Sequence, residues 1–144
     1  MDTLPKYFNR TSRCFNLYRD SRLDGEGITG CQQPYLMAIC RHPGIPQDEL
    51  AKTIYVNKSS VARQLSLLEQ NGFIIRKPCE SDRRQLLVYP TQKAQDLLPK
   101  IHQVIQDWNR RILEDFTPEE TEILLNMLKK IREKAMDIAD HPDE

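Results

Sequence analysis

The sequence contains no apolar run that approaches the roughly 20 residues of a membrane-spanning helix, and its N-terminus lacks the apolar core of a secretory signal. It also lacks a glycine-rich phosphate loop, an ordered set of Ser, His and Asp, and paired metal ligands. Its three histidines, His42, His102 and His141, are scattered. We therefore expect a cytoplasmic protein without a membrane segment, which is not an enzyme and holds no cofactor or metal.

The 144 residues suffice for one compact domain, and 39% hydrophobic residues can form a modest core. The net charge is zero, which argues against a protein that coats nucleic acid without sequence preference. The charge is unevenly distributed, however: residues 57–84 include six basic and three acidic residues, whereas residues 112–144 include four basic and ten acidic residues. Such a separation would orient the molecule as it approaches a polyanion such as DNA.

Residues 45–90 carry the most informative pattern, because they read as two short helices, a longer helix and a basic-tipped β-hairpin. Pro46 suits the first turn of a short helix in which Leu50, Ala51 and Ile54 recur at helical spacing. Asn57 is a favoured N-cap for the longer helix, and Gly72 is a suitable stop. This order predicts a winged helix-turn-helix, whose longer helix would read DNA.

The longer helix has an apolar stripe of Val61, Leu65 and Leu68, which we expect to be buried. The stripe leaves polar residues facing outward over the first turns, namely Lys58, Ser59, Ser60, Arg63 and Gln64. We expect Arg63 and Gln64 to contact base edges in the major groove. Asn57, Lys58, Ser59 and Ser60 would instead fix the register on phosphates, helped by the positive end of the helix dipole. The alternative is an ordinary helix with a polar outer face.

Two runs of β-formers, residues 73–78 and 84–90, flank a short polar segment and predict the hairpin. Its outer end concentrates positive charge in Arg76, Lys77, Arg83 and Arg84. A solvated turn gains nothing from such like charges, whereas a phosphate backbone or a minor groove would bind them. We expect Asp82 to orient the guanidinium of Arg84 through a charge-assisted pair.

These residues resemble the multiple antibiotic resistance regulators, the MarR family. The matching elements are Glu49-Leu50-Ala51, Val61-Ala62-Arg63, the run from Leu68-Glu69 through Gly72 to Arg76, Asp82-Arg83-Arg84, and Thr91. The resemblance implies a mainly α fold with a small β-hairpin wing, in which the winged helix-turn-helix is flanked by N- and C-terminal dimerisation helices. It also implies that Arg84 enters the minor groove. One departure is Pro90 before Thr91, and we expect the last wing strand to be an edge strand or to end there.

The predicted organisation is a single domain over residues 1–144, with a DNA-binding lobe at about 31–90 and dimerisation helices at about 3–22 and 91–139. Apolar residues recur at helical spacing in these flanking helices, at Leu4, Phe8, Phe15 and Tyr18, then at Ala94, Leu98, Ile101, Ile105, Trp108 and Ile112, and finally at Leu124, Leu128, Ile131, Ala135 and Ile138. Thr117 and Pro118 predict the start of the last helix. A bundle within one chain would bury these faces, but the resemblance favours a homodimer.

The resemblance implies that a homodimer binds double-stranded DNA at a pseudo-palindromic site and acts as a transcriptional regulator, a repressor of nearby genes released by a small-molecule effector or an oxidant.

 By resemblance, regulation would act through the angle between the long helices, which sets the spacing of the two reading heads. A rival interpretation is a winged-helix domain that contacts proteins and not DNA.

Cys14 is a redox candidate, because residues 14–18 with Ser21 and Arg22 resemble the first helix of the organic-peroxide sensors in the same family. In those sensors tyrosines of the partner subunit hydrogen-bond the reactive thiol, and the nearest substitute here is Tyr35. The ordinary alternative is a small apolar residue packed in a helix. The four cysteines include no Cys-x-x-Cys pair, which argues against metal binding, and Cys79 on the hairpin is expected to be exposed.

Overall fold

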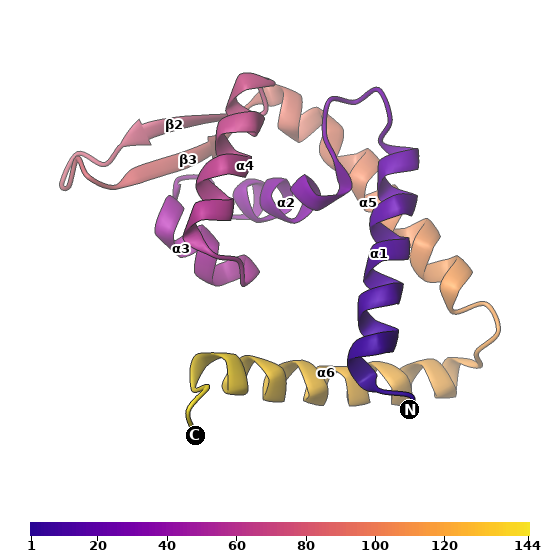
Figure 1. Cartoon of the computed structure of the whole chain (residues 1–144). Helices are drawn as coiled ribbons and strands as arrows, with labels where there is room; N and C mark the ends of the chain where they lie inside the picture. Colours follow the sequence, from indigo (N-terminus) through magenta and orange to yellow (C-terminus); the bar gives the residue numbers. More distant parts are fainter. The chain divides into compact units, whose positions relative to one another are not determined.

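The structure is a computed structural model that describes residues 1–144 (Figure 1). Its elements in chain order are α1 (Leu4–Arg22), η1 (Gly30–Gln32), α2 (Gln33–Arg41), β1 (Ile45–Pro46), α3 (Gln47–Ile54), α4 (Lys58–Gln70), β2 (Ile74–Pro78), β3 (Leu86–Pro90), α5 (Gln92–Ile112) and α6 (Pro118–Asp140). The predicted class, mainly helical with a small β wing, is confirmed. None of the helices combines the length and apolarity that crossing a membrane requires.

The sheet has three antiparallel strands in the order β1-β3-β2. The predicted hairpin is the β2–β3 pair, in which Arg76 lies opposite Val88. The two-residue strand β1 was not predicted; it pairs through Ile45 with Val88. As a result β3 is the central strand and not an edge strand, although it ends at Pro90 as expected. A proline is tolerated there because β1 pairs only with Leu87 and Val88, so that β3 has no neighbour on the β1 side at Pro90.

The region between residues 45 and 57 differs from the prediction in two ways. It contains one short helix, α3, and the second short helix is α2, which lies earlier in the chain. Pro46 precedes α3 as its N-cap, with extended backbone (φ −61°, ψ 141°), and does not occupy the first helical turn. The helix ends at Tyr55, whose φ of 55° is left-handed, so the chain reverses before Asn57.

Helix α4 forms as its sequence predicts. Asn57 is the N-cap, and Val61, Leu65 and Leu68 are buried on one stripe. The helix ends before Gly72, whose φ of +80° is the conformation that only glycine adopts at little cost. The N–H groups of Gly72 and Phe73 donate to the carbonyl oxygens of Glu69 and Leu68, which satisfies the last turn.

The chain divides into two compact units, residues 1–106 and residues 107–144. The first unit contains the hydrophobic core, whose largest fully buried side chains are Phe73, Leu23, Leu36, Ile39, Leu50, Leu65, Leu68, Ile74 and Ile101. Helix α5 buries Ala94, Leu97, Ile101 and Val104 in this core. Ala94 and Ile101 of the predicted dimerisation stripe thus lie in the core of their own chain, whereas Leu98 and Ile105 remain half-buried.

The second unit contains α6, which starts as predicted. Thr117 Oγ1 accepts from the Glu120 N–H at 3.1 Å, and Glu120 Oε1 accepts from the Thr117 N–H at 3.1 Å. This reciprocal capping satisfies two backbone donors at the helix start. No residue of α6 is buried, although the helix carries Ile123, Leu125, Met127 and Ile138. These four side chains are exposed in a single chain, whereas Leu124, Leu128 and Ile131 of the predicted stripe are half-buried.

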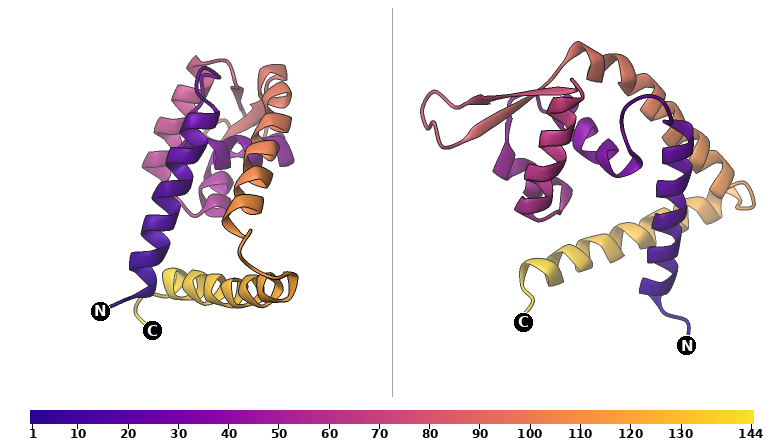
Figure 2. Two further views of the ribbon diagram at one scale, coloured as in Figure 1. Left: turned by 90° about the vertical axis from the view of Figure 1, so that its right-hand side faces the viewer. Right: turned by 45° about the horizontal axis from the view of Figure 1, so that its top comes forward.

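The β2–β3 hairpin projects beyond α3 and α4 and ends in the loop of residues 79–85 (Figure 1). Figure 2 shows the same projection from a second direction. The fold thus presents the hairpin tip to solvent while the other ends of β2 and β3 lie at the core, through Ile74 and Val88.

The contrast between two leucines of α4 tests this core. Leu65 is 0% exposed and Leu67 is 38% exposed. We expect Leu65→Ala to lower the free energy of unfolding by about 2–5 kcal/mol, because it leaves a cavity in the core. The matched variant Leu67→Ala should cost less than about 1 kcal/mol. Urea unfolding at one protein concentration measures both, and equal losses would contradict the described orientation of α4.

Candidate nucleic-acid interface

The start of α4 is organised by Asn57. Its Oδ1 accepts from the Ser60 N–H at 2.7 Å and from the Ser59 hydroxyl at 2.8 Å. The first of these bonds is a helix N-cap, which satisfies a backbone donor that the helix itself leaves free. Asn57 and Ser59 are both exposed, so the capped end of the helix lies at the surface. The other uncapped N–H groups and the positive end of the helix dipole are available to an anion there.

Arg63 occupies the centre of the outward face of α4. It lies two residues from Val61 and two from Leu65, and at about 100° per residue this places it roughly opposite the buried stripe. Its side chain is exposed and makes no hydrogen bond or ion pair within the chain. A guanidinium without an internal partner retains all its donors for another molecule. The neighbouring Lys58 is also exposed, with its Nζ 3.8 Å from Asp48 Oδ1.

Gln64 does not face outward as the sequence analysis expected. It is half-buried, and its Oε1 accepts from Gln32 Nε2 at 3.1 Å. Gln32 is itself buried, and its Oε1 accepts from the Thr29 N–H at 3.0 Å. Gln64 turns inward because its position around the helix axis is next to the buried stripe, on the side of α4 that faces η1. Gln64 therefore serves the contact between α4 and η1.

The hairpin tip presents two exposed arginines, Arg83 and Arg84, whose side chains form no hydrogen bond or ion pair in the chain. Both lie in the loop, because β3 starts at Leu86 and not at residue 84 as predicted. Asp82 Oδ1 accepts from the backbone N–H of Arg84 at 3.1 Å. Asp82 thus shapes the turn through the backbone, whereas the expected pair with the Arg84 guanidinium is not formed. The Asp82 carboxylate therefore fixes the backbone position of Arg84 but does not orient its guanidinium.

Cys79 lies at the base of the same loop and is half-buried, not exposed as predicted. Its backbone N–H donates to the Gln85 carbonyl at 2.8 Å. Its Sγ is 3.2 Å from the Ser81 hydroxyl. This hydroxyl, followed by the backbone N–H groups of Ser81 and Asp82, holds the pKa of the Cys79 thiol below its usual value. Burial has the opposite effect on Cys40, since it raises the pKa of that thiol.

The two basic residues of β2 have different environments, because side chains alternate across a strand. Arg76 shares its face with the buried Ile74 and bonds to residues of α3 and α4. Lys77 points to the opposite face, where its Nζ is 5.5 Å from the centre of the Tyr89 ring. From the sequence, both residues are expected to contact phosphates, and for Arg76 the structure does not bear this out. The strand period, applied from Ile74, was the signal that could have separated them.

The redox and metal candidates do not come together into a site. Cys14 is exposed on α1, and Tyr35 is buried in the core of its own chain at 5% exposure. Tyr35 is thus packed within its own subunit, which does not favour it as a tyrosine offered to a partner. No group of three or more His, Cys, Asp and Glu residues is placed to hold a metal ion.

The model of the MarR family matches residues 31–86, which include α3, α4 and most of the hairpin. Among curated proteins, the chain is 31% identical over 117 residues to the HTH-type transcriptional regulator BilQ of Clostridium symbiosum (strain WAL-14163), a match that covers 81% of each protein.

Solved structures agree over almost the full length. A crystal structure of MarR superposes with a TM-score of 0.87 at 30% identity and covers 97% of each chain. A protein from Listeria monocytogenes, described as a MarR family transcriptional regulator and complexed with 26mer DNA, superposes with a TM-score of 0.86 at 28% identity, covering 95% of this chain and 91% of that one. The similarity therefore includes the helices outside the winged lobe.

Two substitutions of Asn57 distinguish its role as the N-cap of α4 from its closeness to bound DNA. Asn57→Ala removes the acceptor of two hydrogen bonds, and we expect a loss of about 1 kcal/mol in the free energy of unfolding. Asn57→Asp keeps the acceptor and suits the helix dipole, so stability should be retained while the added negative charge weakens duplex binding. Urea unfolding and fluorescence anisotropy measure the two effects. Wild-type duplex affinity in Asn57→Asp would mean that this end of α4 lies away from nucleic acid.

Proposed function

This chain belongs to the MarR family, and from that premise we propose that it is a transcriptional regulator that binds double-stranded DNA as a homodimer at a pseudo-palindromic site. Helix α4 enters the major groove, where Arg63 contacts base edges. Asn57, Lys58, Ser59 and Ser60 contact phosphates at the start of the helix. The hairpin tip places Arg83 and Arg84 against the neighbouring backbone or minor groove.

The proposal rests on one observation: two separate surfaces of the chain expose arginines that have no partner within the chain. Arg63 stands exposed at the centre of the outward face of α4, and Arg83 and Arg84 stand exposed at the tip of a projecting hairpin. Exposed arginines without internal partners are suited to bind phosphates and guanine edges bidentately. The Listeria relative, which is 28% identical, was solved with DNA and supports the same ligand for this chain.

The homodimer is supported by apolar side chains that a single chain leaves uncovered. In α1, Leu4 is 57% and Leu17 is 69% exposed, and in α6, Ile123 is 58% and Ile138 is 57% exposed. Each helix by itself thus exposes apolar surface, and contact of this surface with water is energetically unfavourable. A second copy of the chain, joined by two-fold symmetry, would cover such surfaces on both subunits at once.

The two-fold symmetry of the dimer determines the spacing of the DNA half-sites and suggests how an effector would release the DNA. Its two α4 helices would read half-sites about one helical turn apart, roughly 34 Å. A small-molecule effector or an oxidant that changes the distance between them would remove the contacts of one half-site. Repression of nearby genes would then end when that signal is present. Oxidation of Cys14 is one such signal, and it stays a prediction.

Selection from a pool of random duplexes tests the function. We expect the wild-type protein to recover two inverted copies of one short motif, with an affinity that falls steeply as salt is added. A winged helix that binds only proteins would recover no motif and would show no such salt dependence. That outcome would contradict the proposal.

Arg63→Ala should change which sequence is recovered. We expect the same inverted arrangement with one base pair of each half-site no longer specified, because the contact of the guanidinium with a base edge is lost. The matched control is Lys52→Ala, an exposed basic residue of α3 that we do not place at DNA, and it should return the wild-type motif. An unchanged motif in Arg63→Ala would contradict the assignment of Arg63.

Cys79 provides a native reporter of the hairpin. Its lowered pKa predicts faster alkylation by iodoacetamide at neutral pH than at Cys40, whose pKa is raised. A selected duplex at saturation should slow the alkylation of Cys79, because the DNA covers the hairpin tip. Mass spectrometry of the labelled peptides measures each cysteine separately.

Cys40 on α2 is the internal control, since it packs against the hydrophobic core and lies outside the proposed interface. Its alkylation rate should be the same with and without the duplex. Equal rates at Cys79 with and without bound duplex would contradict the proposed role of the hairpin.

A further inference from the structure

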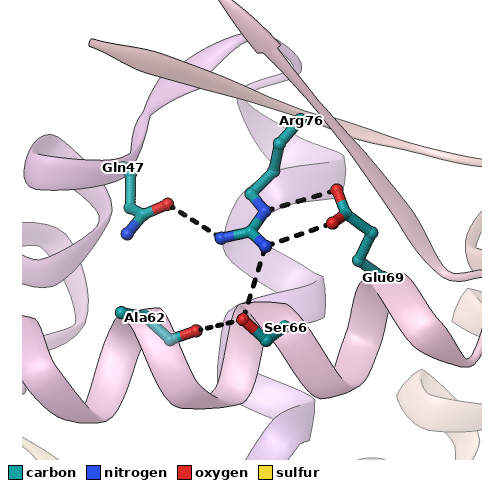
Figure 3. A network of polar contacts seen from close by, with 5 residues as sticks. All are labelled: Gln47, Ala62, Ser66, Glu69 and Arg76. Carbon is teal, nitrogen blue, oxygen red and sulfur yellow. Dashed lines mark hydrogen bonds and ion pairs between the residues drawn. The ribbon is translucent and has the colours of Figure 1, made fainter. Parts of the chain in front are cut away.

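Arg76 forms the most extensive side-chain network of the winged lobe (Figure 3). Its Nε and Nη2 donate to the two carboxylate oxygens of Glu69, at 3.3 and 3.1 Å. Nη2 also donates to Ser66 Oγ at 3.4 Å, and Nη1 donates to Gln47 Oε1 at 3.4 Å. The Ser66 hydroxyl in turn donates to the Ala62 carbonyl at 3.0 Å, which leaves its oxygen free to accept from Arg76.

This network leaves Arg76 little capacity to bind another molecule. A guanidinium has five N–H donors, and the four bonds described above occupy all but one of them. The side chain is only 18% exposed, and the Glu69 carboxylate beside it already balances its charge. Hydrogen bonds from Arg76 are also the main reason that the pKa of Glu69 lies below its ordinary value.

The network joins three elements, β2, α3 and α4. Their relative orientation determines whether the hairpin tip and α4 can contact the same DNA duplex. Arg76 belongs to β2, Ser66 and Glu69 to α4, and Gln47 is the first residue of α3. The planar fork of arginine can bond to all three partners at once, whereas a lysine ammonium offers a single point of attachment. The bonds therefore restrict the angle between the hairpin and α4.

We propose that Arg76 is a positioning residue: through Glu69, Ser66 and Gln47 it holds the hairpin at a fixed angle to α4, so that Arg83 and Arg84 meet DNA while Arg63 reads it. This inference rests on the proposed DNA-binding function and differs from the sequence-based expectation that Arg76 contacts a phosphate itself. The two roles predict opposite results for the residues around Arg76.

Glu69→Met gives the clearest separation. If Arg76 is a positioning residue, this variant frees the guanidinium and the hairpin, and affinity for a duplex recovered by the wild-type protein should fall about tenfold. If Arg76 contacts a phosphate directly, loss of a nearby negative charge should leave the affinity unchanged or increase it. Fluorescence anisotropy with the full chain measures the affinity, and thermal unfolding verifies that the variant is folded.

The matched control is Glu80→Met, which removes a negative charge from the hairpin loop, where Glu80 is exposed and has no bonded partner. It should bind the duplex at least as tightly as the wild-type protein. Glu69→Met binding as tightly as Glu80→Met would overturn the proposal.

Arg76→Lys adds a test that keeps the positive charge and most of the side-chain volume. The positioning role predicts a loss similar to that of Glu69→Met, because one ammonium cannot bond to α3 and α4 together. A phosphate contact would instead survive in Arg76→Lys. Retained affinity in this variant would overturn the proposal even if a more drastic substitution failed to fold.

A double-mutant cycle with Arg84→Ala distinguishes positioning from a general effect on stability. If Arg76 acts through the hairpin, Arg76→Lys should cost much less affinity once Arg84 is absent. If the two costs instead multiply in the double variant, Arg76 does not act through Arg84 and the proposal is wrong. Failure of the proposed function is recognised separately, because the wild-type protein would then recover no duplex from the random pool.

Discussion

The burial of one stripe of α4 is the constraint on which the rest of the structure depends. Val61, Leu65 and Leu68 are fully buried, and their removal from water holds the helix in one rotation about its axis. That rotation directs Arg63 outward and turns Gln64 toward Gln32. Residues that follow one another in the sequence thus acquire different tasks, because a helix advances about 100° per residue.

The hairpin depends on the same helix for its orientation. Ile74 anchors β2 in the core, and two residues later Arg76 bonds to Glu69 on α4. The strand then continues beyond the core, so that Arg83 and Arg84 lie at its exposed tip. Positive charge is therefore sorted by position along the strand. The arginine near the core supports the structure, and those at the tip remain available to a ligand.

Much of this could be predicted from the sequence, because it follows from local rules. The Asn57 cap, the stripe of α4, the glycine stop and the hairpin depend on residues within one or two turns of each other. Strand β1 was not predicted, since two residues become a strand only by pairing with the distant β3. The partners of Gln64 and Arg76 were missed for the same reason: Gln32 and Gln47 come from elements that only the tertiary fold brings near. A basic residue near a hairpin tip looks like a phosphate ligand until those partners are known.

The central claim is that α4 lies in the major groove while the hairpin tip meets the adjacent minor groove or backbone. Methylation of a bound duplex by dimethyl sulphate tests this claim most directly, because it modifies guanine N7 in the major groove and adenine N3 in the minor groove. The account predicts protected guanines at the centre of each half-site and protected adenines on the outer side of both. Protection in one groove alone, or none at all, would contradict it.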